Sequence, residues 1–558
     1  MIYFRLYDQP GMAAHSTFRA PLPVTPKMES GMPQTVPQVS QTRAERFPFS
    51  TVLIANRGEI AVRVIRACHD LGLRAVAVYS DADREATHVR LADEAVRIGP
   101  PPASESYLRM DAILDAARQT GATAIHPGYG FLSENPDFAD ACAAAGITFI
   151  GPSGDVMRAM GEKTAARRKA QEANVPVTPG YDAGVADGAE ALAQAERIGY
   201  PVMLKAASGG GGKGIRFVHR AGDLEAALRL ARSEAQSSFG DPTVYIEKAI
   251  MPARHIEVQI FGDQHGNVIH LGERECSIQR RHQKLIEESP SPALDEATRA
   301  RLLESAVRLA KTVNYTGAGT AEFLLGPDGQ FYFLEVNARL QVEHPVTEWR
   351  VGLDLVREQF RVAAGLELSV RQEDVEFRGH AIEARITAED PLNRFLPASG
   401  SVAALRDPAG PGVRLDSALY QGMRVPLFYD SLLAKVICWG ADREEAIARL
   451  RRALDEYVIA GVRTTIPFAQ WITRHPRFLA GDFSTDFIAE EWKPEEAGAP
   501  EASAKGLDEE QIAALAAALV AREGGSLAQG QAASDGAHEE GWQWRLAGRR
   551  AVTSGAGW

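Results

Sequence analysis

The feature that most constrains this chain is an alternating polar and apolar stretch at positions 331–343. It reads Phe-Tyr-Phe-Leu-Glu-Val-Asn-Ala-Arg-Leu-Gln-Val-Glu. Successive side chains of an extended strand point to opposite faces of a sheet, so the polar residues share one face if the stretch stays extended. They are Glu335, Asn337, Arg339, Gln341 and Glu343. The stretch therefore predicts a strand with one polar and one apolar face.

A turn joins this strand to an apolar run that contains Glu322. The turn signal is Gly326-Pro-Asp-Gly329. A two-residue loop within it pairs Glu322 with Phe333 and leaves Glu322 diagonal to Glu335, about 7–8 Å away on the same face. Two carboxylates and Asn337 then share a surface, and such hard oxygen ligands suit Mg2+ bound together with nucleotide phosphates. The alternative is a polar sheet face that contacts only solvent.

Four consecutive glycines mark a second candidate site, in the segment Ser208-Gly-Gly-Gly-Gly-Lys-Gly-Ile215. Backbone without side chains can approach phosphate oxygens and donate several N–H groups at once, so Gly210, Gly211 and Gly212 are candidates for a phosphate clamp. A Walker loop would need Ser or Thr after the Gly-Lys pair, but Gly214 stands there. The clamp is therefore of another kind, and the alternative is a flexible linker.

A run of basic and amide residues, Cys276-Ser-Ile-Gln-Arg-Arg-His-Gln-Lys284, could meet phosphate or a small anion. A solvated surface run is the alternative. The formal net charge of −12 argues against a nucleic acid partner, which normally requires a basic face on the protein. It leaves room for a local cationic pocket.

Length and composition predict a multi-domain globular enzyme. The 558 residues exceed one core, because about 150 residues per domain gives three or four units. The longest apolar stretch, Ile512 to Ala521, is shorter than the roughly 20 residues needed to cross a bilayer, so we expect no membrane span. The four cysteines are widely separated without a CxxC spacing, which predicts neither disulfides nor a zinc site and favours a reducing compartment.

The pattern of strands and helices predicts α/β and α+β units. From Thr51 to about residue 165, strand-like and helical runs alternate, which predicts a Rossmann-like parallel sheet flanked by helices. Only Gly58 marks the first turn, so a nicotinamide-binding GxGxxG fingerprint is rejected. A small α+β unit follows at about 178–250, and a larger strand-rich unit continues to about 490.

Five segments, in order over roughly residues 50 to 490, together resemble biotin carboxylase, a family of ATP-grasp enzymes. They are Ile54-Ala-Asn-Arg-Gly-Glu-Ile-Ala61, His126-Pro-Gly-Tyr-Gly-Phe-Leu-Ser-Glu-Asn135, the glycine segment 208–215, Glu273-Arg-Glu-Cys-Ser-Ile-Gln-Arg-Arg-His-Gln-Lys284 and Glu335-Val-Asn-Ala-Arg-Leu-Gln-Val-Glu-His344. The chain departs from the family pattern at Ala338, where Thr or Ser is more usual.

The resemblance implies a domain order. The expected parts are a disordered extension at 1–47, the Rossmann-like N-terminal (pre-ATP-grasp) biotin carboxylase domain at 48–165, the ATP-grasp lid with its lead-in at 166–250, the ATP-grasp core at 251–380, the C-terminal biotin carboxylase domain at 381–492, and a linker with the stub of a following domain at 493–558.

The resemblance also implies site residues, with ATP between the lid and the strand-rich domain. ATP would contact Lys163, Lys205, Gly210, Gly211, Gly212, Glu247, Lys248, Ile250, His255, Gln279, His282 and Lys284, the backbone at 247–250 reading adenine. The metal, Mg2+ or Mn2+, would bind Glu322, Glu335 and Asn337. Arg339, Gln341 and Val342 would hold bicarbonate. The implied catalytic residues are Arg339, Glu343 and Arg385.

In the implied mechanism, Glu343 deprotonates bicarbonate, which attacks the γ-phosphorus of ATP to give carboxyphosphate. Carboxyphosphate releases CO2, the remaining phosphate deprotonates the ureido nitrogen of biotin, and Arg385 stabilises the resulting enolate oxygen. Two rivals stay open. A carbamoyl-phosphate-forming ATP-grasp ligase would use ammonia or glutamine-derived nitrogen, and a non-catalytic scaffold would have lost the ligands that are present here.

The expected partners are a biotin carboxyl carrier protein or domain and a carboxyltransferase subunit, in a homodimer or larger complex, because the Met-Lys-Met setting of a biotin-accepting lysine is absent. No nucleic acid or membrane partner is expected. The tail resembles the propionyl-CoA carboxylase α subunit at Ser484-Thr-Asp-Phe-Ile488, the expected helix 508–522 and Trp542-Gln-Trp-Arg-Leu546. We therefore expect part of an acetyl- or propionyl-CoA carboxylase, present as a fragment, a split subunit or a truncated gene product.

The expected location is the cytoplasm. It becomes the mitochondrial matrix if the first 47 residues, which hold five basic and few acidic residues, are a transit peptide. The alternative is an over-extended start, with Met28 or Met32 as the true first residue.

Overall fold

A computed structural model describes residues 47–181, 183–206 and 215–494 of the chain. The predictions for the N-terminal extension, for the glycine clamp at Gly210, Gly211 and Gly212, and for the tail with its helix at 508–522 lie outside the described residues. Among the helices that are described, none has the length and apolar character required to pass through a bilayer.

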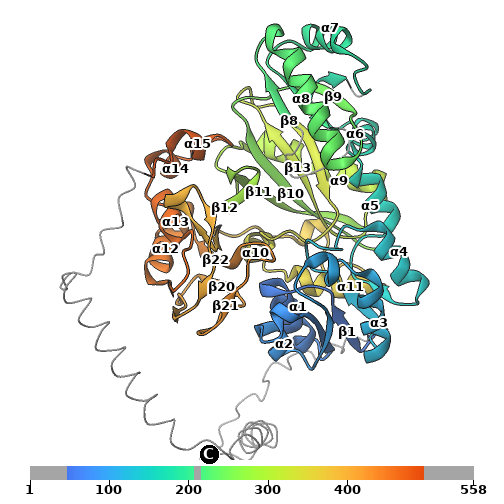
Figure 1. Ribbon diagram of the computed structural model, residues 1–558, viewed down its shortest axis with the longest axis vertical. Coiled ribbons are helices and arrows are strands. Elements are labelled where there is room, and N and C mark those ends of the chain that lie inside the picture. The colour runs from blue at the N-terminus through green and yellow to red at the C-terminus, as the bar shows by residue number, and fades with distance from the viewer. Residues whose placement is uncertain (1–46, 182, 207–214, 495–558) are drawn as a thin grey trace, which may run out of the picture. The chain divides into compact units, whose positions relative to one another are not determined.

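The N-terminal part is a parallel sheet with helices on its faces, as predicted (Figure 1). The strands follow the order β3-β2-β1-β4-β5, and the short apolar strand β1 lies at the centre with all four residues buried. Its elements are β1 (Thr51–Ile54), α1 (Gly58–Asp70), β2 (Arg74–Ser80), η1 (Asp81–Asp83), α2 (Thr87–Leu91), β3 (Glu94–Gly99), η2 (Ala103–Glu105), α3 (Met110–Thr120), β4 (Ala124–His126), α4 (Pro136–Ala144) and β5 (Thr148–Phe149).

A small antiparallel sheet with its own apolar core follows, at the top of Figure 1. Its strand order is β6-β9-β7-β8, and the predicted α+β unit at about 178–250 is confirmed. The elements are α5 (Gly154–Gly161) and α6 (Lys163–Glu172) in the lead-in, then β6 (Gly180–Tyr181), α7 (Gly188–Ile198), β7 (Val202–Ala206), β8 (Ile215–Val218), α8 (Ala221–Phe239) and β9 (Val244–Lys248).

An antiparallel sheet in the order β14-β13-β10-β11-β12-β15-β22-β20 runs through the rest of the described chain. Its strands are β10 (Arg254–Gly262), β11 (Val268–Arg280), β12 (Gln283–Ser289), β13 (Gly317–Leu325), β14 (Phe331–Asn337), β15 (His380–Thr387), β20 (Val413–Ser417) and β22 (Leu432–Gly440). The pairing of β12 with β15 makes the sheet continuous, so side chains from both halves can meet on one face. The division into domains at 380 remains a proposal.

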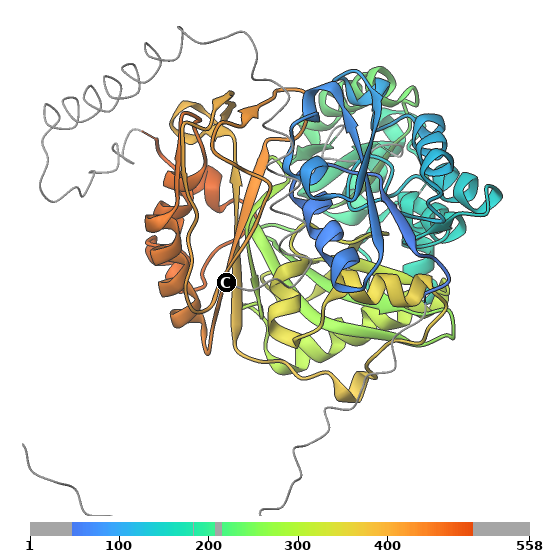
Figure 2. The same cartoon turned by 90° about the horizontal axis from the view of Figure 1, so that it is seen from below.

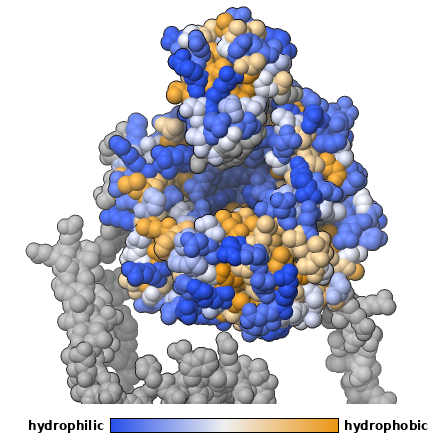
Figure 3. Space-filling model, turned by 45° about the vertical axis from the view of Figure 1, so that its right-hand side comes forward, coloured by the Kyte–Doolittle hydropathy of each residue, from blue (hydrophilic) through white to orange (hydrophobic). Residues whose placement is uncertain are grey.

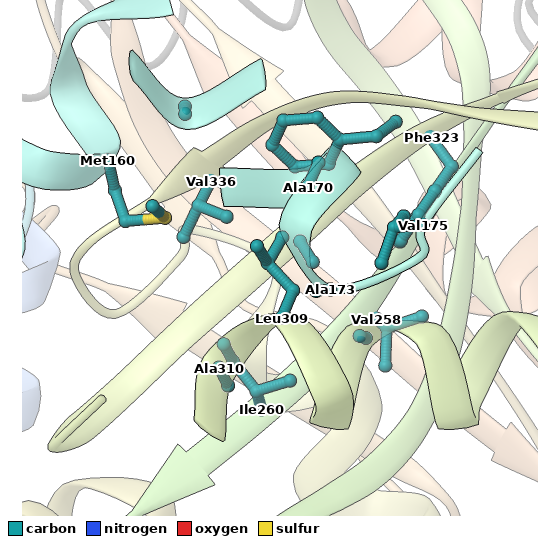
Figure 4. Packing of buried hydrophobic residues seen from close by; sticks show 14 of the residues in the cluster. Met160, Ala170, Ala173, Val175, Val258, Ile260, Leu309, Ala310, Phe323 and Val336 are labelled. Carbon is teal, nitrogen blue, oxygen red and sulfur yellow. The ribbon is translucent and has the colours of Figure 1, made fainter. Parts of the chain in front are cut away.

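Helices pack against this sheet on its apolar face (Figure 4). Val258 and Ile260 of β10 and Phe323 of β13 meet Leu309 and Ala310 in one buried cluster. The helix that supplies the last two is α9 (Glu296–Thr312), which Asp295 caps by accepting from the Thr298 N–H at 2.7 Å. With its apolar face covered, the sheet directs its polar residues to the other face.

The C-terminal strands are covered by α12 (Arg443–Glu456), seen beside them in orange in Figure 2. Asp442 caps this helix by accepting from the Glu445 N–H at 2.8 Å. The remaining elements are α10 (His344–Val351), α11 (Leu355–Ala363), η3 (Gln372–Asp374), β16 (Glu389–Asp390), η4 (Pro391–Asn393), β17 (Leu396–Pro397), β18 (Gly400–Ser401), β19 (Ala404–Arg406), β21 (Arg424–Val425), β23 (Val458–Ala460), α13 (Ile466–Ile472), α14 (Pro476–Leu479) and α15 (Phe487–Glu491).

A buried histidine joins the N-terminal sheet to α11. His126, the last residue of β4, is fully buried; its Nδ1 accepts from the Gly128 N–H at 3.0 Å, and its Nε2 lies 3.2 Å from Gln359 Oε1. An acceptor at Nδ1 requires the neutral ring. Burial lowers the pKa of His126 to about 3.

Acid should therefore destabilise the fold through His126. An unfolded histidine has a pKa near 6.5, so stability is complete above that pH, and about 2 kcal/mol is lost at pH 5, where only the unfolded chain binds the proton. In His126→Gln, the fall in the urea midpoint between pH 7 and pH 5 should be smaller than in the unchanged chain, whereas substitution of the exposed His265 by Gln should leave it unchanged. The same pH dependence in His126→Gln would contradict this.

Candidate active site

The hairpin β13–β14 brings Glu322 and Glu335 together more directly than predicted. Glu322 pairs with Glu335 and Phe323 with Phe333, so the expected pairing of Glu322 with Phe333 is wrong. The reason is a β-bulge: Leu334 is an extra residue on β14, so Glu335 takes the place opposite Glu322. Phe333 consequently lies in the core while Glu335 faces Glu322.

The polar stretch also leaves the strand earlier than an extended chain would. β14 ends at Asn337, and residues 338–343 form an irregular connection to α10, for which Glu343 is the N-cap residue. We call residues 338–343 the anion loop. The prediction of one straight strand face is therefore wrong for Arg339, Gln341 and Glu343. Of the three, Gln341 contacts Glu322 directly, its Nε2 donating to Glu322 Oε1 at 3.4 Å.

Lys284 links three buried glutamates in the centre of the site. Its Nζ lies 2.9 Å from Glu322 Oε1 and 2.7 Å from Glu343 Oε1, and it also donates to Glu257. Burial alone would lower the pKa of Lys284, but Glu257, Glu322 and Glu343 more than offset this and hold it well above the usual value. The basic run that contains Lys284 is thus part of a buried network at this residue.

Glu343 connects Lys284 to Arg385. Its other oxygen, Oε2, accepts from Arg385 Nη2 at 2.9 Å, while Arg385 Nε donates to Glu287 Oε1 at 2.6 Å. Burial would raise the pKa of Glu343, but Lys284, Arg385 and Arg274 hold it well below its usual range. By contrast, burial raises the pKa of Glu287 to about 7.

Arg339 fixes the polar groups of the anion loop. Its Nη1 donates to Gln341 Oε1 and its Nη2 to Asn337 Oδ1, both at 2.9 Å, and its Nε donates to Glu134 Oε2 at 2.8 Å. Asn337 Nδ2 in turn donates to Glu322 Oε1 at 2.9 Å. These bonds fix the plane of the guanidinium, a group whose planar geometry suits recognition of a small anion.

Cationic groups gather beside these carboxylates. Lys163 is the first residue of α6, and the buried Lys205 of β7 forms an ion pair with Glu247. The exposed His282, in the β11–β12 turn, lies within electrostatic range of both lysines and of His255. His255 Nε2 lies 3.1 Å from Glu322 Oε2. These neighbouring cationic groups, in a chain of net charge −12, suit a polyphosphate.

The residues expected near adenine lie at the end of β9. Lys248 Nζ donates to the carbonyls of Gly199 and Tyr200 at 2.9 Å, so its side chain forms hydrogen bonds within the small 178–250 unit. Gln279 is buried and pairs across the strands with Lys284.

The hollow seen in Figure 3 lies below the upper part of the molecule, and its visible walls are hydrophilic.

The donor set fits a hard divalent cation at one side of the site. Clusters of possible ligand atoms among the described residues are His255–Glu257–Glu322 and Glu257–Cys276–Glu343, and Lys284 already meets their three carboxylates. Glu335 belongs to neither cluster. Burial and the facing Glu322 raise the pKa of Glu335. A divalent cation between Glu322 and Glu335, in addition to the Lys284 ammonium group, would relieve the repulsion between the two carboxylates.

Several residues of this network were not predicted from the sequence. Glu257 and Gln259 alternate with buried apolar residues along β10, a period-two signal that could have marked a polar face. Arg274 is completely buried and donates to Glu257 and Gln259. Glu134 lies in a recognised segment, but no spacing rule connects it to Arg339, 205 positions away.

In chemical terms, the site combines a cationic region, a facing carboxylate pair and an ionised carboxylate shared between two cations. Such a site can bind a phosphate ester, orient a small anion and accept a proton, with each function assigned to separate side chains. Phosphoryl transfer relies on such positioning and charge neutralisation and needs little covalent participation by the protein.

Comparisons with known families agree with this geometry. The model described as "Biotin carboxylase, N-terminal domain" matches residues 48–157, and "Biotin carboxylase C-terminal domain" matches 383–490. Between them, "Carbamoyl-phosphate synthase L chain, ATP binding domain" matches 162–371. The ATP-binding part is thus shared with another family, and the flanking parts distinguish the two.

Individual relatives extend over most of the chain. Biotin carboxylase 1 of Bacillus subtilis is 53% identical over 438 residues, 78% of this chain and 97% of that protein. The propionyl-CoA carboxylase alpha chain of Ruegeria pomeroyi is 48% identical over 491 residues, 84% of this chain and 72% of that protein.

A solved structure agrees as well. The biotin carboxylase domain dimer of Hydrogenobacter thermophilus 2-oxoglutarate carboxylase, in complex with MgADP, ADP and bicarbonate, has a TM-score of 0.77 at 46% identity, over 80% of this chain and 98% of that one. The predicted resemblance and fold class are confirmed. The chain belongs to the biotin carboxylase family of ATP-dependent ligases.

Proposed function

We propose that this chain uses ATP and bicarbonate to carboxylate biotin that another domain or protein carries, as part of an acetyl- or propionyl-CoA carboxylase. The observation that carries the proposal is the position of Glu343, whose two oxygens bind Lys284 and Arg385 separately. One carboxylate thereby borders both a phosphate-side cation and a second cation suited to an enolate oxygen.

In the first half-reaction, Lys163, Lys205 and Lys284 hold the phosphates, with Gly210, Gly211 and Gly212, His255, Gln279 and His282 around the nucleotide and the backbone of Glu247, Lys248 and Ile250 reading adenine. Glu322, Glu335 and Asn337 would hold Mg2+ or Mn2+, which neutralises charge on the transferred phosphoryl group when bound. These residues act mainly by positioning, since the attacked phosphorus needs an aligned nucleophile and dispersed charge.

Arg339, Gln341 and the Val342 N–H hold bicarbonate while Glu343 removes its proton. A carboxylate with so low a pKa is a weak base while Lys284 and Arg385 both bind it. We infer that Glu343 gains basicity when Lys284 turns to phosphate and Arg385 to biotin, because each departing cation raises its pKa. The oxygen of bicarbonate then attacks the γ-phosphorus and ADP leaves.

In the second half-reaction, carboxyphosphate breaks its C–O bond to give CO2 and phosphate. The phosphate takes the ureido proton of biotin, and Arg385 stabilises the enolate oxygen that forms before nitrogen attacks CO2. Arg339 flanks the same place. Glu287 Oε1 accepts from Arg385 Nε at 2.6 Å, so that Arg385 Nη2 points toward Glu343 and the substrates.

The final acceptor is a matter for the carboxyltransferase partner. The relatives named above include a propionyl-CoA carboxylase chain and a 2-oxoglutarate carboxylase domain, and the residues of this site contact no acyl group in the proposed mechanism. A biotin carboxyl carrier protein or domain, a carboxyltransferase and a second copy of this chain are the proposed partners. The related dimer supports the last of these.

A reducing compartment is proposed, the cytoplasm or the mitochondrial matrix. Cys68, Cys142, Cys276 and Cys438 are all buried and free in the described structure. Buried thiols without partners are compatible with the reducing conditions of either location.

Nucleotide turnover tests the proposed function against the carbamoyl-phosphate rival. ATP hydrolysis by the purified chain should require bicarbonate and increase on addition of free biotin, because biotin consumes CO2 and phosphate at the site. Dependence on ammonia instead of biotin would favour the rival, and no turnover under any of these conditions would favour a scaffold.

Glu322→Gln and Glu335→Gln should each raise the Mg2+ concentration needed for half-maximal ATPase. Loss of an outer-shell partner alone weakens metal sites by about 10–100-fold, so loss of an anionic ligand should exceed about 10-fold. Glu304→Gln, on α9 outside the site, is the matched control, and thermal unfolding checks each fold. If both site variants keep the metal dependence of the control, the carboxylates are not ligands.

Substitution of Glu343 and Arg385 should separate the half-reactions. Glu343→Gln should reduce both ADP release and ¹⁴C incorporation into biotin by about 10²–10⁴-fold, since no base prepares bicarbonate. Arg385→Ala should reduce incorporation by about 10²–10³-fold while ADP release continues, because carboxyphosphate still forms and decays. Arg443→Ala, which removes an arginine bound to Glu288, is the control. Equal losses in both assays for Arg385→Ala would refute its assignment.

A further inference from the structure

The anion loop is held from outside the ATP-binding part at two points. Near its start, Glu134 accepts from the Ala338 N–H at 2.9 Å and from Arg339 Nε at 2.8 Å. Near its end, Lys435 Nζ donates to the Val342 carbonyl at 2.8 Å. Glu134 comes from the N-terminal part and Lys435 from β22, so both flanking parts of the chain contact the loop.

Lys435 is a fully buried cation with a specific set of neighbours. Its Nζ lies 3.2 Å from Glu59 Oε1 on α1 and 3.7 Å from Asp416 Oδ2 on β20. Glu59 also accepts from the Tyr129 hydroxyl. Glu59 and Tyr129 belong to two of the recognised segments, Ile54–Ala61 and His126–Asn135. Neither residue has a role in the proposed mechanism.

The ammonium group of Lys435 points to the anion loop. Its shortest contact is with the neutral Val342 carbonyl, although Glu59 Oε2 and both oxygens of Glu383 are buried without a hydrogen-bond partner. Burial alone would lower the pKa of Lys435, but Glu59, Glu383 and Asp416 more than offset this and raise it. A cation kept charged at this point fixes the carbonyl between Gln341 and Glu343.

Lys435 also lies beside Arg385. The two residues pair across β15 and β22, so both side chains leave the sheet on one face. The carbonyl that Lys435 holds precedes Glu343, whose carboxylate binds Arg385. Lys435 thus fixes the backbone next to the base, whereas Arg385 binds its side chain.

We propose that Lys435, oriented by Glu59 and Asp416, is a positioning residue that fixes the anion loop for bicarbonate. This inference rests on the proposed function, because it takes Gln341 and the Val342 N–H as bicarbonate donors. A loop whose Val342 carbonyl is released can change its backbone torsions on both sides of Val342, which moves the Val342 N–H and the Glu343 carboxylate while leaving the phosphate-binding lysines in place.

Steady-state kinetics of Lys435→Met test the proposal, because Met keeps the length of the side chain and removes its charge and donors. The KM for bicarbonate should rise by about 10-fold or more, as displacements near 1 Å can cost up to about 10²-fold, while the KM for ATP stays within about 2-fold. Arg299→Met is the matched control, since Arg299 pairs with the buried Glu273 at 2.9 Å outside the site. It should change neither KM.

A milder variant keeps the test decisive if Lys435→Met does not fold. Glu59→Gln retains the shape and removes the charge nearest to Lys435, and should raise the bicarbonate KM selectively by about 3–10-fold. A folded Lys435→Met or Glu59→Gln with an unchanged bicarbonate KM would overturn the proposal. So would an equal rise in both KM values, which indicates a general structural role.

Gln341→Ala separates this inference from the proposed function. If Gln341→Ala leaves the bicarbonate KM unchanged, the assignment of the anion loop fails, and the role of Lys435 fails with it. If Gln341→Ala raises the bicarbonate KM while Lys435→Met does not, only the role of Lys435 is wrong.

Discussion

The arrangement of this site depends on one buried ammonium group, that of Lys284. Glu257 on β10, Glu322 on β13 and Glu343 at the start of α10 all direct a carboxylate to it. Three anions at this depth would repel one another without a cation, and removing one partner of a buried ion pair typically costs on the order of 3–5 kcal/mol. Lys284 therefore keeps β10, β13 and the anion loop together. In the proposed mechanism the same charge also binds phosphate, so the group that holds these carboxylates together would also rearrange them on nucleotide binding.

The continuous sheet makes this network possible. β12 carries Lys284 and Glu287, and its neighbour β15 carries Arg385, so the pairing of these strands brings together groups about one hundred residues apart in sequence. With α9 and α12 covering apolar surfaces, the polar side chains of the strands are left to face one another. Glu134 and Glu59 reach the same region from the N-terminal part. The site is therefore assembled from three parts of the chain.

Local sequence patterns predicted much of the fold and part of the site. The predictions that were wrong or missing have physical causes. The parallel N-terminal sheet, the small lid unit and the hairpin before Asn337 were predictable, since alternation and turn residues encode them directly. The register was wrong because a bulge at Leu334 leaves no signature in an otherwise alternating run. Lys435 was missed because it is a lone basic residue in an apolar strand, and Arg274 because it stands between two glutamates in a polar run; only the folded sheet reveals the distant carboxylates that make their burial tolerable. The roles of the site residues came from the family resemblance and not from the spacing.

In the proposed mechanism, bicarbonate attacks the γ-phosphorus at this site and is then cleaved to supply CO2 to biotin. Isotope transfer tests it most directly: turnover with ¹⁸O-labelled bicarbonate and free biotin in unlabelled water should place one bicarbonate oxygen in each phosphate released, because the attacking oxygen stays on phosphorus when carboxyphosphate breaks its C–O bond. Mass spectrometry of the phosphate gives the answer. Phosphate that contains oxygen from water and none from bicarbonate would rule out this mechanism.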